Sequence, residues 1–274
     1  DTCRQLAPSS FEEIGRYSAV SRQPVGGPEI HQAYQALLTC PVGAIGTEQS
    51  DKALVETAMG SFPLPIEDGV SYCGFNSEKS FGANSFLIEH PDGNWLIDSP
   101  RYIKHLIEAF EQRGGIAHIF LTHQDDVADS DKYAAHFDAK RIIHRADVAA
   151  APTADWIIEG EETSRIGPDF QIIPVPGHTA GSMALLYRET FLFTGDHLWW
   201  NPHAKLLEAP TRLIWNKSAL LESIEKLLEY RFEWVLAGHG DRVHLSVEDM
   251  QAQVQALVAR RQRPGEADPG PVGA

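Results

Sequence analysis

The sequence has few cysteines, no long apolar run and no leader-like start, and each absence excludes a class of protein. Three cysteines in 274 residues are too few, and odd in number, for a secreted scaffold held by disulfides, which favours a reducing compartment. No apolar stretch approaches the ~20 residues that cross a bilayer, so we expect no membrane partner. The start lacks the basic and apolar regions of a signal peptide and also lacks methionine, which indicates a processed or truncated end. We expect a cytoplasmic protein, or one in an organelle or plastid stroma after removal of a transit peptide.

Basic residues are also scarce. The chain has 23 Lys and Arg against 38 Asp and Glu, a formal net charge of -15. Such a chain repels phosphate backbones and anionic lipids unless a basic patch compensates locally. The one dense basic run, Arg260-Arg261-Gln262-Arg263, is short and typical of a solvated helix end. We therefore expect a small-molecule substrate, with no nucleic acid and no membrane among the partners.

Composition divides the chain into four segments. Residues 1–60 carry scattered prolines, and residues 61–69, "SFPLPIEDG", are predicted to be a linker because they contain two prolines and an Asp-Gly turn. Residues 70–263 alternate strand-like and helix-like runs and form the expected main domain. Residues 264–274 are rich in proline and glycine, so we expect a flexible tail.

The main domain begins with a hairpin and continues as alternating strands and helices. Two strand-like runs, 83–90 and 94–99, flank the tripeptide "PDG", a strong hairpin signal. Helices are expected over 102–115, 131–139, 217–231 and 246–262. This order indicates a sheet-rich α/β domain with helices on its outer faces.

Polar side chains follow four of the expected strands. His123 follows "IFLT", His178 follows "IIPVPG", Asp196 follows "FLFTG" and His239 follows "EWVLAG". A rigid sheet can aim side chains on such loops at one point, and imidazole with carboxylate suits zinc, iron or manganese. A single strand-end histidine is more often structural than a ligand, but four such strand ends together predict a metal site.

Four motifs carry a family resemblance: "FLTHQDDVADS", "VPGHTAGSMAL", "LFTGDHL" and "LAGHGD". In this order and spacing they resemble the metallo-β-lactamase superfamily, and "WLIDSP" resembles its early strand with a supporting aspartate, here Asp98. The resemblance covers about residues 70–260. It implies an αββα sandwich, an α/β fold, here with a small N-terminal extension. It also implies a metal-dependent hydrolase of a small ester, thioester, lactone or β-lactam, acting by attack of a metal-bound hydroxide.

The first motif departs from the family pattern His-x-His-x-Asp-His. His123 matches the first histidine, and Asp125 occupies the position of the second. Without a gap, Val127 and Ala128 would take the last two places, and neither can bind a metal. With a two-residue insertion, Asp129 takes the aspartate role and a serine takes the final place. We prefer the gapped alignment, with Asp126 left open as a rival for the same role.

The resemblance therefore implies one site of His123, Asp125 and His178, and a second site of Asp129 and His239, with Asp196 between them. It implies catalytic roles for Asp129 and Asp196. The second site has lost a histidine, so we expect it to be weak or empty. We expect one or two divalent ions, with zinc as the first choice and iron or manganese as alternatives that the added carboxylates allow.

The segment after Asp196 is the expected substrate wall. Trp199 and Trp200 are candidate substrate-binding residues in an apolar cleft, with core packing as the alternative. His203 is a further candidate contact, with an ordinary loop histidine as the alternative. Cys73 is expected to be a packed thiol, because no base is adjacent in sequence.

The N-terminal segment carries a second resemblance. Cys3, in "CRQLAP", and Cys40, in "CPVGA", resemble ligands of single-cluster [4Fe-4S] ferredoxin domains, with two unrelated cysteines as the alternative. The family's two further cysteines lie upstream of the position of Cys3, before the chain begins. Since a cluster needs four thiolates, we expect no iron–sulfur cluster in this chain and a ferredoxin-like remnant over residues 1–60.

Two alternatives to the hydrolase stay open. One is a ferredoxin-linked oxidoreductase with a di-iron site, which implies an electron-transfer partner if a longer protein carries a cluster. The other is a binding protein with a degraded metal site.

Overall fold

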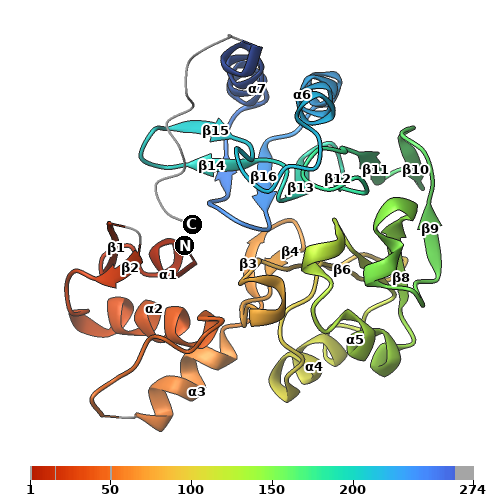
Figure 1. Ribbon diagram of the computed structural model, residues 1–274. Coiled ribbons are helices and arrows are strands. Elements are labelled where there is room, and N and C mark those ends of the chain that lie inside the picture. Colours follow the sequence, from red (N-terminus) through yellow and green to blue (C-terminus); the bar gives the residue numbers. More distant parts are fainter. Residues whose placement is uncertain (1, 16, 50, 263–274) are drawn as a thin grey trace. The chain divides into compact units, whose positions relative to one another are not determined.

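The structure is a computed structural model that describes residues 2–15, 17–49 and 51–262 (Figure 1). The chain forms two compact units. Of the described residues, unit 1 contains those up to Ile119 and Ala128–Lys140, whereas unit 2 contains Phe120–Val127 and residues 141–262. The expected tail, 264–274, lies outside the described residues.

The start of unit 1 is a small helical segment with one hairpin. Its elements are α1 (Thr2–Leu6), β1 (Phe11–Ile14), β2 (Tyr17–Val20), α2 (Gly26–Thr39) and α3 (Lys52–Gly60). Helix α3 begins at Asp51, whose carboxylate accepts hydrogen bonds from the backbone N–H groups of Ala53 and Leu54. Helix α2 packs against both α1 and α3.

The first large sheet has seven strands in the order β3-β4-β5-β6-β7-β8-β9. The strands are β3 (Leu64–Glu67), β4 (Val70–Tyr72), β5 (Phe86–Ile88), β6 (Trp95–Ile97), β7 (His118–Phe120), β8 (Lys140–His144) and β9 (Trp156–Ile158). The expected hairpin is β5–β6, paired antiparallel from Phe86↔Ile97 to Ile88↔Trp95. Helices α4 (Lys104–Glu111) and α5 (Ser130–Phe137) belong to unit 1 and overlap two of the predicted helical ranges.

Strand β3 lies within residues 61–69, where a linker was expected. It pairs antiparallel with β4 through Leu64↔Tyr72. The strand is the first in the sheet order, and such an edge position tolerates proline, here Pro65, because no ladder bond is needed on its free side. The prolines that indicated a linker therefore mark an edge strand, and the segment boundaries themselves stay a prediction.

Unit 2 contains the second large sheet, of six strands in the order β10-β11-β12-β13-β16-β17. The strands are β10 (Ser164–Ile166), β11 (Phe170–Pro174), β12 (Met183–Tyr187), β13 (Phe191–Gly195), β16 (Trp234–Ala237) and β17 (Val243–His244). Strands β13 and β16 are parallel, and a separate two-stranded sheet joins β14 (Trp199–Asn201) to β15 (Leu206–Glu208). The central strands β11, β12 and β13 are buried along their whole length.

Helices α6 (Lys217–Lys226) and α7 (Val247–Gln262) cover one face of this sheet, as Figure 1 shows. Ile173 and Leu186 of the sheet meet Ile224 of α6 and Met250 and Val254 of α7 in one buried cluster. Burying each such side chain contributes about 1.5–3 kcal/mol. The sheet that carries the polar strand ends is therefore held rigidly from its helical side.

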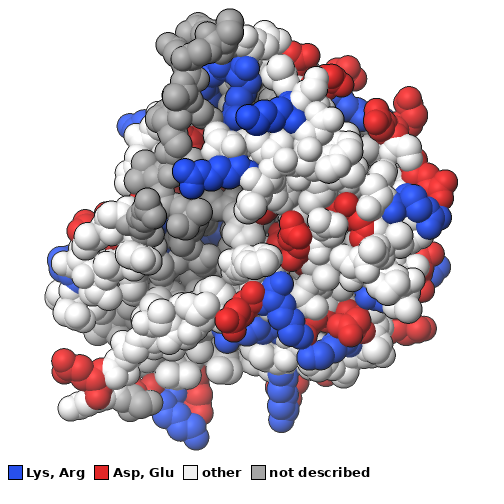
Figure 2. All heavy atoms as spheres, viewed as in Figure 1, with Lys and Arg blue, Asp and Glu red and all other residues white. Residues whose placement is uncertain are grey.

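Two global features bear on partners. Among the described residues, no helix combines the length and the apolarity that crossing a bilayer requires. On the face drawn in Figure 2, basic and acidic side chains of the described residues are interspersed.

Candidate metal centre

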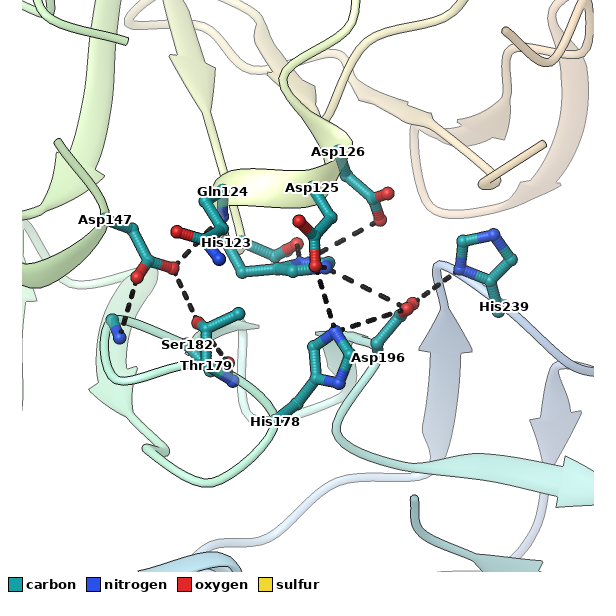
Figure 3. A network of polar contacts seen from close by, with 12 residues as sticks. His123, Gln124, Asp125, Asp126, Asp147, His178, Thr179, Ser182, Asp196 and His239 are labelled. Carbon is teal, nitrogen blue, oxygen red and sulfur yellow. Dashed lines mark hydrogen bonds and ion pairs between the residues drawn. The ribbon is translucent and has the colours of Figure 1, made fainter. Parts of the chain in front are cut away.

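Loops of unit 2 bring the predicted strand-end ligands together (Figure 3). His123 comes three residues after β7 and is followed by the short 3-10 helix η2 (Gln124–Asp126). His178 lies between β11 and β12, Asp196 directly after β13, and His239 two residues after β16. The sheet thus places side chains from four loops at one point.

One group of donors consists of His123, His178 and Asp196, whose ligand atoms all lie within 4.8 Å of one another. Asp196 Oδ2 is 3.7 Å from His178 Nε2 and 3.9 Å from His123 Nε2. Asp125 Oδ2 lies 3.4 Å from His178 Nε2 and 3.8 Å from His123 Nε2. Most of these distances are long for hydrogen bonds. Two donors each ~2.1 Å from one tetrahedral ion are about 3.4 Å apart, so the spacing fits ligands around an ion.

The imidazoles of this group carry unsatisfied nitrogens. His123 Nε2 and both ring nitrogens of His178 have no hydrogen-bond partner within the part of the chain that the structure describes. These side chains are 1% and 9% exposed. A buried polar atom without a partner is costly unless something binds it. Nitrogens aimed at a shared point beside carboxylates therefore fit a divalent ion.

A second group consists of Asp126, Asp196 and His239, again with ligand atoms within 4.8 Å of one another. His239 Nδ1 lies 2.7 Å from Asp196 Oδ1. Asp126 is fully buried. Asp196 belongs to both groups, and a shared carboxylate is a feature of two-ion sites.

Electrostatics hold two of the donors, Asp196 and His123, in their ligand forms. Burial would raise the pKa of Asp196, but the imidazoles of His239, His123 and His178 outweigh it and hold that pKa below its usual range. Burial lowers the pKa of His123 against the opposing effect of the nearby carboxylates, so its imidazole stays neutral. A carboxylate and a neutral imidazole are the forms that bind metal.

A glycine lets the loops approach closely. A Cβ atom on Gly238 would lie 2.9 Å from Asp126 Oδ2 and 3.0 Å from Asp196 Oδ1. The backbone after β16 therefore passes directly beside two carboxylates of the second group, which a larger residue would displace.

Asp129 has different neighbours, within unit 1. Its Oδ1 accepts hydrogen bonds from Lys79 Nζ at 2.6 Å and Lys132 Nζ at 2.9 Å, and its Oδ2 from the Tyr102 N–H at 3.2 Å. Among the described residues, neither donor group includes Asp129. The rival Asp126 belongs to the second group, and Asp196 belongs to both. The metal and catalytic roles of Asp129 stay predictions.

The three candidate substrate-binding residues, Trp199, Trp200 and His203, lie in different surroundings. The Trp199 ring packs on Gly240, where a Cβ atom would lie 2.5 Å from Trp199 Cγ. Trp200 packs against the core cluster under α6 and α7, which is the alternative left open for it. His203 is exposed in the turn between β14 and β15. Of the three, Trp199 lies beside the loop of His239, and the substrate roles stay predictions.

These features define a class: an α/β protein with a His/Asp metal site on loops after its strands, as in metal-dependent hydrolases. Residues 63–259 match the family described as the metallo-beta-lactamase superfamily, and the chain belongs to that superfamily. The expected hydrolase class is thereby confirmed, with a candidate His/Asp metal site.

Relatives and solved structures agree with this membership. A hydroxyacylglutathione hydrolase of Xanthomonas oryzae pv. oryzae is 26% identical over 176 residues, covering 61% of this chain and 69% of the relative. One from Pectobacterium carotovorum subsp. carotovorum is 26% identical, covering 52% of this chain and 55% of the relative, so the chain spans about half of its length. The structure of the BLEG-1 B3 metallo-beta-lactamase aligns with a TM-score of 0.53 at 20% identity, covering 69% of this chain and 99% of that one. The αββα sandwich with a small N-terminal extension is confirmed.

The N-terminal segment requires a correction. Residues 1–47 match the family described as the 4Fe-4S single cluster domain of Ferredoxin I, so the expectation of no iron–sulfur cluster in this chain is wrong. Cys3 in α1 and Cys40 at the end of α2 are both half-buried thiols. A [4Fe-4S] cluster takes four thiolates, and these two fit as half of that set. The error came from counting thiols alone.

Proposed function

We propose that the protein hydrolyses a small acyl thioester at its His/Asp centre. The observation that carries the proposal is the buried convergence of His123, His178 and Asp196, with their donor atoms within 4.8 Å of one another. The relatives' name, hydroxyacylglutathione hydrolase, supports an acyl thioester as the substrate class. At 26% identity this name stays a guide to the substrate class only.

The ligand set that we propose has two parts that share Asp196. His123, Asp125 and His178 complete the first part, and Asp126 and His239 complete the second. A divalent ion bound here would acidify a water molecule and polarise the acyl carbonyl of the substrate. Three carboxylates beside three imidazoles favour iron or manganese more than an all-imidazole set would. The second part has one imidazole and would bind its ion more weakly than the first part.

The chain's own residues orient the water and move its proton. Asp196 stays ionised because its pKa lies below the usual range, so it can hold its position between the two parts. Asp125 has a side chain 40% exposed, against 17% for Asp196, so it can pass a proton to solvent. A thiol has a pKa of about 8.5, so a thiolate leaves without a strong general acid. A site of carboxylates and neutral imidazoles therefore suits a thioester better than an amide.

The ferredoxin match supports a second candidate function. A [4Fe-4S] domain at residues 1–47 favours a ferredoxin-linked oxidoreductase, in which the carboxylate-rich centre would hold two iron ions. Iron quantified in the His/Asp centre of protein purified anaerobically, with no hydrolysis of any acyl substrate, would favour this candidate over the hydrolase.

The decisive experiment compares substrates and metals together. Protein stripped of metal is reloaded with Zn²⁺, Mn²⁺ or Fe²⁺ and assayed on chromogenic thioesters, oxygen esters and a β-lactam of matched size. We expect the highest kcat/KM on the thioester, lost on chelation and regained with metal. A preference for the β-lactam, or activity that survives chelation, would overturn the proposal.

A further inference from the structure

A buried carboxylate outside the ligand set joins the two loops that carry His123 and His178. Asp147 lies in the 3-10 helix η3 (Arg145–Ala150) and is 2% exposed. Its Oδ2 accepts a hydrogen bond from the backbone N–H of Gln124 at 3.0 Å and another from Thr179 Oγ1 at 2.6 Å. Its Oδ1 accepts from the backbone N–H of Gly181 at 3.1 Å. Figure 3 shows these bonds beside the metal centre.

Each of the three residues that donate a hydrogen bond to Asp147 is adjacent in sequence to a proposed metal ligand or a few positions from one. Gln124 follows His123 directly, and Thr179 follows His178 directly. The network is closed by Ser182, whose Oγ accepts from the Thr179 N–H at 3.0 Å and lies 2.9 Å from Thr179 Oγ1. Since the Thr179 hydroxyl proton points to Asp147, the Ser182 hydroxyl donates in the second contact. All three donors around Asp147 are therefore fixed in direction.

The close approach of the backbone shows that this arrangement is specific. A Cβ atom on Gly181 would lie 2.6 Å from Asp147 Cγ, so the loop reaches the carboxylate only because residue 181 is glycine. Within residues 2–15, 17–49 and 51–262, the groups that contact the Asp147 carboxylate are two backbone N–H groups and one hydroxyl, with no lysine or arginine among them. A buried charge without a counter-ion depends on its hydrogen bonds, so loss of one donor would move the loops.

We propose that Asp147 is a positioning residue that sets the spacing of His123 and His178 for metal binding. This inference rests on the proposed metal site. Ligand positions must hold to within about 0.2 Å to bind a given ion well, and residues that orient ligands typically change affinity by about 10–100-fold. Asp147 acts on two ligands from one carboxylate, so its removal should affect the first part of the site as a unit.

The test is the Zn²⁺ affinity of the full chain, measured by competition with a chelating dye. In Asp147→Asn an NH2 group would face at least one of three donors. We expect its dissociation constant for Zn²⁺ to rise by about 10–100-fold. On a thioester at saturating Zn²⁺, kcat should fall while KM stays close to the wild-type value. Thr179→Val should show a smaller rise in the dissociation constant, and Thr179→Ser, which keeps the hydroxyl, should restore wild-type affinity.

Two controls separate positioning from general stability. Val254→Ala, in the core under α7, should lower the unfolding midpoint without changing Zn²⁺ affinity. Asp155→Asn removes a carboxylate that accepts the Arg141 N–H at 3.0 Å, away from the ligand loops, and should leave affinity unchanged. Wild-type Zn²⁺ affinity in both Asp147→Asn and Thr179→Val would overturn the inference. If Asp147→Asn does not fold, the two Thr179 variants decide alone.

Affinity also separates this inference from the proposed function. If wild-type protein binds Zn²⁺ but cleaves no thioester, the proposed function fails while the affinity comparison still decides the role of Asp147. If wild-type protein binds no metal, both fail.

Discussion

His239 Nδ1 lies 2.7 Å from Asp196 Oδ1, within hydrogen-bond distance. The other oxygen of the carboxylate, Oδ2, faces His178 Nε2 at 3.7 Å. Each oxygen of Asp196 therefore serves a different group. Because this single carboxylate orders both parts of the site, its loss should lower metal affinity more than the loss of any other proposed ligand.

Metal stoichiometry should follow this division. Asp196→Asn should lower occupancy of both parts, whereas His178→Ala should affect the first part and His239→Ala the second. Because residues that merely orient ligands cost about 10–100-fold, loss of a ligand should cost more than about 100-fold in affinity. Metal per chain, measured by elemental analysis with circular dichroism to check the fold, gives the answer. Equal loss in all three variants would argue against two parts.

Asp126 and Asp129 should differ in their effect on the second part. Asp126 lies in the donor group with His239, whereas Asp129 is bonded to Lys79 and Lys132. Asp126→Asn should weaken the second ion by more than about 100-fold, and Asp129→Asn should leave its affinity within a few-fold of wild type. Titration with Mn²⁺ followed by electron paramagnetic resonance measures both. The reverse order of effects would restore the ligand role that the sequence favoured for Asp129.

Asp129 should instead contribute pH-dependent stability. Burial raises the pKa of its carboxyl, but the hydrogen bonds from Lys79 and Lys132 outweigh this and hold the pKa below its usual range. A depressed pKa stabilises the folded state above the unfolded value of about 3.9, and this stability is lost as pH falls through the folded value. Asp129→Asn should therefore lower the free energy of unfolding by about 1 kcal/mol at neutral pH, given its exposed lysine partners, and by progressively less at an acidic pH below the unfolded value.

Urea unfolding at the two pH values checks this expectation. Asp131→Asn, an exposed carboxylate in the first turn of the same helix, is the matched control. A cost for Asp129→Asn that persists unchanged at acidic pH would show that its charge is not what stabilises the fold.

The sequence points to His178, Asp196 and His239 as candidate ligands because each follows an apolar strand beside a glycine, and the structure brings them together. It favoured Asp129 over its rival Asp126 and showed nothing of Lys79, which binds Asp129 from 50 residues away in the chain. A contact between residues so far apart in the chain leaves no pattern in the local sequence.

Three further features were hidden from the sequence for similar reasons. Asp147 was missed because a lone aspartate in a short 3-10 helix carries no motif, although its partners lie beside two ligands. For Trp200 the sequence left both a cleft and core packing open, because it does not show that this side chain packs against the cluster under α6 and α7. Residues 61–69 contain strand β3, and the sequence alone does not separate an edge strand from a linker because proline suits both.

Gly238 should be essential to the second part of the site. A Cβ atom there would lie 2.9 Å from Asp126 Oδ2 and 3.0 Å from Asp196 Oδ1, so Gly238→Ala must displace both carboxylates by several tenths of an ångström. We expect the second ion to bind about 10–100-fold more weakly, with kcat/KM reduced. Gly60→Ala, where a Cβ atom meets nothing within 4 Å, is the control and should change neither quantity. Unchanged metal binding in Gly238→Ala would mean that the carboxylates shift freely.

The cysteines should differ in their effect on iron and sulfide. Cys40 is half-buried at the end of α2 within the ferredoxin-like match, whereas burial raises the pKa of the Cys73 thiol to about 12, so Cys73 stays protonated at neutral pH. Since thiolates are the cluster ligands, Cys40→Ser and Cys3→Ser should lower iron and acid-labile sulfide, and Cys73→Ser should not. Iron, sulfide and visible absorbance of protein purified anaerobically measure this. Equal losses in all three variants would mean that they reflect destabilisation of the fold, because Cys73 lies outside the matched segment.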